Sequence, residues 1–207
     1  MSHPERSTAR YVAFEGTEGA GKSSVVTLIA DRLRSTGSDV VTVREPGGTA
    51  VGEAIRSILL DGDPVPMARA EATLFAAARA QLAAEVVAPA LDRGAWVLSD
   101  RSVYSSLAYQ AGGRGIPTDQ VRTLNDIALG GLWPDVVVLL RIDSDGGLRR
   151  QAASDRIGDE DPSFHDAVVD AFDALARDEP DRFEVIDASQ PIERVVAEIM
   201  DRLEARE

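Results

Sequence analysis

The stretch Gly16-Thr17-Glu18-Gly19-Ala20-Gly21-Lys22-Ser23 decides the fold, because it matches the pattern G-x-x-x-x-G-K-[ST] in a strand-to-helix context. The short apolar run Tyr11–Glu15 precedes it, and a segment with helical spacing, Ser23–Thr36, follows it. Glycines let backbone N–H groups converge on phosphate oxygens, and the N-terminus of the following helix adds its positive end. Motif and context together predict a phosphate-binding loop.

Two side chains of this loop have distinct predicted tasks. Lys22 is the only lysine among the 22 basic residues, all the others being arginine. Its flexible ammonium group can reach the β and γ phosphates inside a tight loop, where a planar guanidinium is bulkier, and the Ser23 hydroxyl can ligate Mg²⁺. We therefore predict that ATP and Mg²⁺ are bound, with Ser23 as the metal ligand. The predicted nucleotide contacts are Gly16, Thr17, Glu18, Gly19, Ala20, Gly21, Lys22, Ser23 and Ser24.

Short apolar runs alternate with longer amphipathic segments along the whole chain. The runs are too short for helices and are rich in Val, Ile and Leu, so they predict strands at Tyr11–Glu15, Val40–Arg44, Ala95–Ser99, Val136–Ile142 and Phe183–Ile186. Helical segments are predicted at Ser23–Thr36, Thr49–Leu60, Ala68–Arg93, Thr118–Leu129, Ser163–Arg177 and Ile192–Arg206. This alternation predicts an α/β protein of the P-loop NTPase fold, with a five-stranded parallel sheet covered by helices on both faces.

Length, charge and composition limit the classes of protein to which this chain can belong. A chain of 207 residues suits one domain spanning residues 1–207. Its net charge of −13 argues against a nucleic-acid partner, and no run approaches the roughly 18 apolar residues that a membrane span needs. The absence of cysteine excludes disulfides and thiolate sites. We expect a cytoplasmic protein with no membrane or nucleic-acid partner.

Further motifs identify a family. Arg44-Glu45-Pro46-Gly47-Gly48-Thr49 follows the second predicted strand, Asp100-Arg101 follows the third, and Gly112-Gly113-Arg114-Gly115 comes shortly after. At these residues the chain resembles the bacterial thymidylate kinases, and the resemblance covers nearly the whole chain. It implies transfer of the γ-phosphoryl group of ATP to dTMP, yielding dTDP and ADP, by a homodimer.

The resemblance also implies which residues bind dTMP. Phe75 and Arg79 lie four residues apart on a predicted helix and so share one face. The family resemblance implies that Phe75 stacks on thymine and that Arg79 contacts the base, although Phe75 could equally belong to the core. Arg44 and Arg101 follow the carboxyl ends of strands, where doubly wound sheets bind ligands, and would hold the acceptor phosphate.

Other predicted contacts concern the deoxyribose and the edge of the base. A negative charge inside a phosphate-binding loop is unfavourable, so Glu18 suggests a function. The family resemblance implies that Glu18 contacts the 3′-hydroxyl and that Tyr109 excludes a ribose 2′-hydroxyl. The residues in the region that reads the thymine edge are Ser105, Ser106, Tyr109 and Gln110.

The transition-state cation is predicted to come from outside the P-loop, whose interior holds no arginine. The segment at about 149–162 resembles a lid whose arginines close over the transferring phosphate. The candidates are Arg149, Arg150 and Arg156, with Arg156 preferred. The predicted catalytic residues are Lys22, Glu18, Arg101 and Arg156.

Two other functions fit parts of the sequence. Asp100-Arg101-Ser102 is similar to a segment of deoxynucleoside kinases, which phosphorylate a neutral nucleoside and need a base such as Glu45. A catalytically inactive, ATP-binding regulator would need only the phosphate loop. The motif at Arg44–Thr49 and the Gly-Arg-Gly segment favour the monophosphate kinase.

Overall fold

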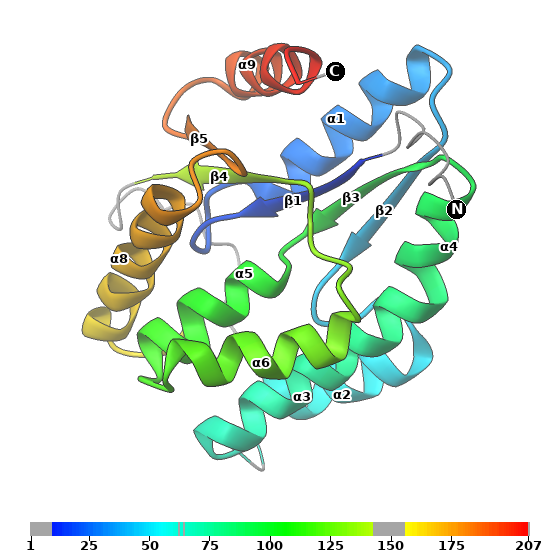
Figure 1. Ribbon diagram of the computed structural model, residues 1–207. Helices are drawn as coiled ribbons and strands as arrows, with labels where there is room; N and C mark the ends of the chain where they lie inside the picture. The colour runs from blue at the N-terminus through cyan, green and yellow to red at the C-terminus, as the bar shows by residue number, and fades with distance from the viewer. Residues whose placement is uncertain (1–9, 62, 64, 143–155, 207) are drawn as a thin grey trace.

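Five parallel strands form one sheet in the order β2-β3-β1-β4-β5. This confirms the predicted five-stranded parallel sheet of an α/β protein. The computed structural model describes residues 10–61, 63, 65–142 and 156–206. The strands lie side by side at the centre of Figure 1. Their bounds are β1 Tyr11–Glu15, β2 Val40–Arg44, β3 Trp96–Asp100, β4 Val136–Arg141 and β5 Phe183–Asp187.

The helices agree with the predicted segments to within one or two residues at most ends, except that no predicted segment covers α5 and η2. Capping explains some of these limits: the Thr49 side chain accepts a hydrogen bond from the Gly52 N–H and begins α2. The bounds are α1 Lys22–Ser35, α2 Ala50–Leu60, α3 Ala68–Leu82, α4 Ala88–Asp92, α5 Val103–Ser106, α6 Thr118–Leu129, α8 Pro162–Asp178 and α9 Ile192–Glu204. Two π-helical segments, η1 Ala83–Val87 and η2 Leu107–Gly113, continue α3 and α5.

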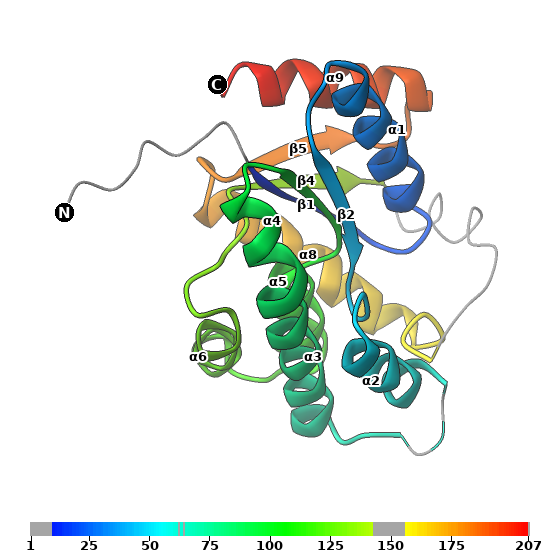
Figure 2. The ribbon, with the colours of Figure 1, turned by 90° about the vertical axis from the view of Figure 1, so that its right-hand side faces the viewer.

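The sheet is covered on both faces. Helices α1 and α9 lie on one face, and α4, α5, α6 and α8 lie toward the other, as Figures 1 and 2 show. Along β4 the side chains alternate between two cores: Val136 and Val138 belong to the cluster with α1 and α9, and Val137 and Leu139 to the cluster with α5, α6 and α8. This confirms the two-sided burial expected from an uninterrupted apolar strand.

The predicted single helix Ala68–Arg93 is interrupted by a π-helical turn. Pro89 has no N–H to donate to the preceding turn, and η1 lies directly before the helix that contains it. Residues Ala68–Asp92 are also long and apolar enough to meet a length-and-hydropathy criterion for a membrane span. In the fold this helix packs against α2 and α6 and holds the buried charges Glu71 and Arg79, so it is a core helix.

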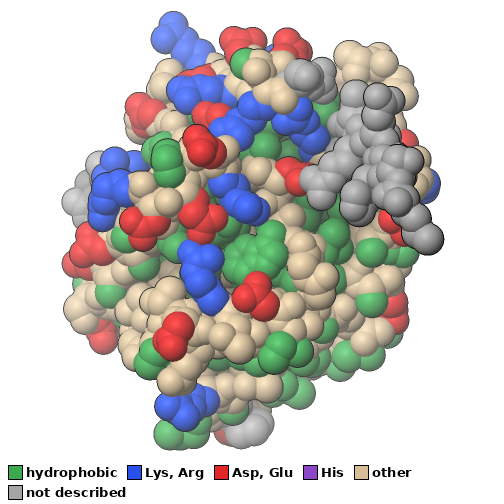
Figure 3. Space-filling model, viewed as in Figure 1, with side chains coloured by type: hydrophobic (Ala, Val, Ile, Leu, Met, Phe, Trp, Pro, Cys, Tyr) green, Lys and Arg blue, Asp and Glu red, His purple; other side chains and the backbone are tan. Residues whose placement is uncertain are grey.

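The carboxyl ends of three strands meet at one edge of the sheet. β1 leads into Gly16, β2 into Glu45 and β3 into Arg101, with Arg44 paired in register to Asp100. Parallel sheets bind ligands at this edge. On the face seen in Figure 3, basic and acidic side chains are interspersed instead of forming patches of one sign. The motifs found in sequence are therefore gathered at the strand ends.

Candidate active site

The phosphate loop adopts a backbone that glycine makes possible. Gly16 has a φ of 135°, and a Cβ there would lie 2.5 Å from the carbonyl oxygen of Leu140. Gly21 has a φ of 87° and directly precedes α1. Lys22, in the first turn of α1, folds back and donates from Nζ to the carbonyl oxygens of Gly16 (3.0 Å) and Thr17 (2.8 Å). The lysine therefore holds the two ends of the loop together.

The ammonium group of Lys22 is buried in a cluster of charges. Burial, together with the nearby Arg101 charge, lowers the pKa of Lys22 from 10.5 to about 8, against the opposing effect of Asp100 and Glu18. A lysine whose charged form is disfavoured by burial gains from an anionic partner. The loop is therefore arranged to bind a strongly anionic group.

Ser23 and Asp100 face each other across the loop. The Ser23 hydroxyl donates to the Asp100 carboxylate at 2.5 Å. A hydroxyl and a carboxylate beside a phosphate loop match the oxygen ligands that Mg²⁺ takes from proteins that bind its nucleotide complex, where phosphates and water complete the shell. Among the described residues no group of three or more His, Cys, Asp or Glu side chains could hold a metal alone. This donor set therefore fits a magnesium ion shared with a nucleotide.

Glu18 is the centre of a second cluster, and the predicted residues Arg101 and Tyr109 meet there. The Arg101 guanidinium lies 2.6 Å from one Glu18 carboxylate oxygen, and the Tyr109 hydroxyl lies 3.0 Å from both. Burial tends to raise the pKa of Glu18, but the Arg101 and Lys22 charges outweigh it and the pKa is lowered. Glu18 therefore stays ionised and fixes both neighbours beside the phosphate loop.

The backbone of Arg101 is also unusual, and a buried carboxylate supports it. Arg101 has a φ of 68°, the one positive φ among the described residues other than glycine. Its Nη1 donates to the Ser105 hydroxyl (3.2 Å), which donates to the fully buried carboxylate of Glu15 (2.6 Å). Ser102, the N-cap of α5, donates to the same carboxylate at 2.7 Å. Glu15 therefore connects the end of β1 to the turn that presents Arg101.

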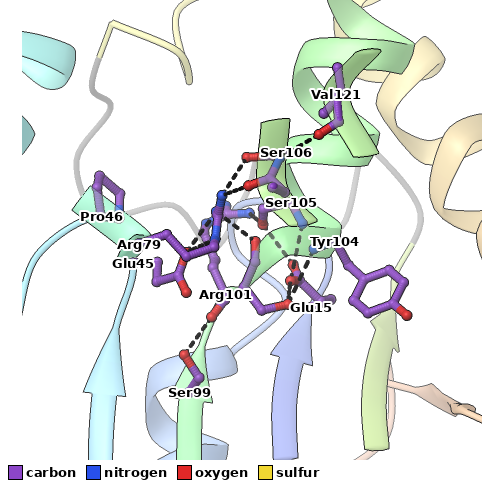
Figure 4. Close-up of polar contacts among 12 residues, drawn as sticks. Glu15, Glu45, Pro46, Arg79, Ser99, Arg101, Tyr104, Ser105, Ser106 and Val121 are labelled. Carbon is purple, nitrogen blue, oxygen red and sulfur yellow. Dashed lines mark hydrogen bonds and ion pairs between the residues drawn. The ribbon is translucent and has the colours of Figure 1, made fainter. Parts of the chain in front are cut away.

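A buried ion pair lies beside these residues (Figure 4). The Arg79 guanidinium lies 2.6 Å from the Glu45 carboxylate, with side-chain exposures of 2% and 4%. Its remaining donors reach the Ser106 hydroxyl (3.1 Å), the Ser102 carbonyl oxygen (3.1 Å) and the Asn125 side-chain oxygen. Every nitrogen of Arg79 is thus engaged by protein groups that tie β2, α3, α5 and α6 together.

One open cleft with a volume of about 690 Å³ joins these clusters. The predicted residues that line it are Glu18, Gly19, Gly21, Lys22, Ser23, Ser24, Arg44, Phe75, Arg101, Ser105, Ser106, Tyr109 and Gln110. Phe75 is half-buried at its wall, so the structure favours the cleft over a purely core position for this ring. Exposed Arg44 reaches the cleft but also pairs with Glu53 at 2.9 Å.

The predicted residues Arg79 and Arg156 are not among the residues that line the cleft. Arg79 does not line the cleft and stands behind Ser106, so its contact with the base stays a prediction. Arg156 donates to the Leu59 carbonyl oxygen (2.9 Å) and to Glu71 (2.7 Å), and within the described part of the chain no hydrogen bond or ion pair joins it to the phosphate loop. Its role as transition-state cation stays a prediction. Arg149 and Arg150 lie outside the described residues.

Several residues of the site were not singled out from sequence. Asp100 lies beside Ser23, and Glu15 supports Arg101 through Ser105. The Glu71 carboxylate accepts a hydrogen bond from Gln110 and forms ion pairs with Arg114 and Arg156. A signal was present, because Glu15 ends an apolar strand and Glu71 lies in an alanine-rich helix, where an unpaired charge would be costly. The partners could not be read from sequence spacing.

Comparison with known proteins assigns the family. A family model described as thymidylate kinase matches residues 14–199. The chain is 45% identical over 206 residues to a thymidylate kinase of Desulfovibrio desulfuricans, covering 94% of this chain and 95% of that one. It is 48% identical over 196 residues to one of Bifidobacterium longum, covering 91% and 94%.

A solved structure agrees with these relatives. The crystal structure of thymidylate kinase from Ehrlichia chaffeensis superposes with a TM-score of 0.81 at 28% sequence identity, covering 95% of this chain and 98% of that one. The family-model match spans most of the chain and includes both the phosphate loop and the acceptor side of the cleft. The chain therefore belongs to the thymidylate kinase family.

Proposed function

We propose that this protein transfers the γ-phosphoryl group of ATP to dTMP, releasing dTDP and ADP. The observation that carries the proposal is the single cleft into which the phosphate loop opens at one end and Phe75, Arg101 and Gln110 at the other. Two anionic substrates bound in one cleft can bring donor and acceptor phosphates together. Family membership supplies the identity of the acceptor.

At the donor end, we propose that backbone N–H groups of Gly16–Ser24 bind the polyphosphate of ATP, with Lys22 on the β and γ phosphates. The Nζ atom of Lys22 would exchange its bonds to loop carbonyl oxygens for phosphate oxygens. Ser23 and Asp100 are the proposed ligands of Mg²⁺, which supplies charge neutralisation of the phosphates when bound.

At the acceptor end, we propose that Arg101 and Arg44 hold the dTMP phosphate and that Phe75 stacks on the thymine. The acceptor oxygen is already anionic near neutral pH, so positioning and charge neutralisation matter more than a general base. This agrees with the state of Glu45, the one candidate base for a nucleoside acceptor, because Arg79 occupies its carboxylate. We propose that Glu18 and Tyr109, which line the same cleft and are hydrogen-bonded to each other, contact the sugar.

An acceptor panel tests the proposal. Purified protein is given ATP and Mg²⁺ with dTMP, dUMP or thymidine, and ADP release and the phosphorylated product are both measured. We expect rapid turnover with dTMP and none with thymidine. Turnover with thymidine but not with dTMP would make the protein a nucleoside kinase, and ATP binding without turnover on any acceptor would make it a regulator.

We also propose a homodimer and a cytoplasmic location, as the family resemblance implies. Exposed apolar side chains support an interface: Val51 and Ile58 on α2 are 49% and 47% exposed, and Ile127 on α6 is 78% exposed. Light scattering at micromolar protein should give twice the chain mass. Ile127→Glu should shift this mass toward the monomer if α6 contributes to the interface.

A further inference from the structure

A buried carboxylate on α3 binds three side chains at the acceptor end of the cleft. Glu71 is 1% exposed, and its carboxylate accepts hydrogen bonds from Gln110 of η2 at 3.1 Å and from Arg114 at 3.2 Å. The third donor residue is Arg156, in the segment that precedes α8, at 2.7 Å. Residues far apart in sequence thus share one charged acceptor.

The same contacts shape the wall of the cleft. Gln110 lines the cleft directly, and Ile157, the neighbour of Arg156, lines it as well. Arg156 also donates to the carbonyl oxygen of Leu59 at 2.9 Å, and the following residue, Leu60, is a further lining residue. The carboxylate of Glu71 therefore holds Gln110 and Arg156, and Arg156 in turn contacts the end of α2. Gln110 and Ile157 line the same cleft as the half-buried ring of Phe75.

The charges of the cluster require the carboxylate to stay ionised. Arg114 and Arg156 both bond to Glu71, and Glu160 adds a second carboxylate 2.6 Å from Arg114. Burial opposes ionisation, but hydrogen bonds from Arg114, Arg156 and Gln110 lower the pKa of Glu71 below its usual value. Without the Glu71 charge, Glu160 alone would face both guanidinium groups, at 2.6 Å from Arg114 and 4.0 Å from Arg156.

We propose that Glu71 is a positioning residue for the acceptor nucleotide: it builds the distal wall of the dTMP site by holding Gln110 and anchoring Arg156. The inference rests on the proposed function and deepens it. Arg156 then anchors the wall at the acceptor end through its neighbour Ile157, and its loss raises the KM for dTMP instead of lowering kcat. The side chains that bond to Glu71 come from outside the phosphate loop, so we expect the ATP contacts to be retained.

The Glu71→Gln variant tests the proposal. The amide keeps the size of the side chain but turns one acceptor oxygen into a donor that faces a guanidinium. We expect the KM for dTMP to rise on the order of tenfold, with kcat and the KM for ATP within about twofold of wild type. The control is Glu85→Gln, an exposed glutamate on the same long helix that contacts Gln81 outside the cleft. We expect wild-type constants for it.

A second variant keeps the test decisive if Glu71→Gln fails to fold. Arg156→Met removes the anchor and retains the apolar stem, so it should raise the KM for dTMP on the order of tenfold with kcat retained. In the double variant the KM for dTMP should rise by less than the two single increases combined, because each single substitution already removes the same contact between Glu71 and Arg156. A fall in kcat with an unchanged KM for Arg156→Met would overturn the proposal in favour of a transition-state cation.

Ligand-induced thermal stabilisation supplies a readout independent of turnover. In Glu71→Gln, the rise in Tm caused by dTMP should shrink, and the rise caused by ATP should remain. Equal loss of both rises would show a general loosening and would overturn the proposal, as would an unchanged KM for dTMP in a folded Glu71→Gln. Failure of the wild-type protein to phosphorylate dTMP would instead contradict the proposed function, so the two failures are distinguishable.

Discussion

The Nζ atom of Lys22 lies 2.8 Å from the carbonyl oxygen of Thr17, so the one lysine of the chain points into the loop that the proposed nucleotide would occupy. A second hydrogen bond to Gly16 keeps the ammonium group over the loop. The carbonyl oxygens hold the cation in position before ATP arrives. Little reorganisation is then needed when phosphate oxygens replace them.

Replacing this cation should abolish most turnover. We expect Lys22→Ala to lower kcat on the order of a thousandfold, because the charge on the transferring phosphoryl group loses its nearest side-chain cation. Thermal stability should change little, since the lost loop contacts are offset by removal of a charge that burial disfavours. Steady-state kinetics and thermal melts check both points. Arg32→Ala, on the exposed side of α1, is the control, and near-normal turnover by Lys22→Ala would contradict the assigned role.

The pH dependence of ATP capture should follow the same group. The free protein holds Lys22 with a pKa of about 8, so kcat/KM for ATP should fall as the pH rises through that value. Because the unfolded chain returns the pKa to 10.5, it binds more protons between these values, and the free energy of unfolding contributed by Lys22 should rise with pH there. A flat kcat/KM profile to pH 9.5 would contradict the first expectation.

The buried pair of Arg79 and Glu45 should dominate stability at the base of the cleft. Arg79→Met leaves the Glu45 charge buried and unpaired, so we expect the free energy of unfolding to fall by about 3–5 kcal/mol. Arg93→Met breaks the exposed pair with Asp39 and should cost less than about 1 kcal/mol. Urea unfolding of both variants measures the difference, and equal losses would show that burial does not decide the cost.

Two tyrosines offer a matched test of the acceptor site. Both donate a hydroxyl to a glutamate: Tyr109 to Glu18 beside the phosphate loop, and Tyr104 to Glu179 away from the cleft. Tyr109→Phe should raise the KM for dTMP about three- to tenfold, because Glu18 loses a bond that fixes it. Tyr104→Phe should leave the kinetic constants unchanged and lower stability by about 1 kcal/mol. Identical kinetic effects of the two variants would remove Tyr109 from the site.

Magnesium dependence should report on Asp100. Asp100→Asn removes the carboxylate that faces Ser23, so the Mg²⁺ concentration for half-maximal activity should rise on the order of tenfold at fixed ATP. Asp92→Asn, an exposed residue that ends α4, is the control. An unchanged magnesium requirement in the Asp100 variant would place the metal elsewhere.

Local patterns were enough to predict the phosphate loop and the type of each main element. The loop could be recognised because its motif is defined by residue types at a fixed spacing along the chain, here Gly16, Gly21, Lys22 and Ser23. Strands such as β4 could be recognised because burial on both faces demands an unbroken apolar run. The π-helical turn before Pro89 was missed, because periodicity does not resolve a single extra residue in a helical turn.

The partners of the buried charges were decided only by the tertiary structure. Glu18 meets Tyr109 across 91 positions, Glu71 meets Arg156 across 85, and Glu45 meets Arg79 across 34. No spacing rule joins such residues, because their distance depends on how β1, β2 and α3 pack around the strand ends. The sequence by itself determined the phosphate loop and the parallel α/β class, since both follow from short-range stereochemistry and burial. Packing in the tertiary structure decided which carboxylate pairs with which arginine. The physical reason is that a buried charge without a partner destabilises the folded state strongly.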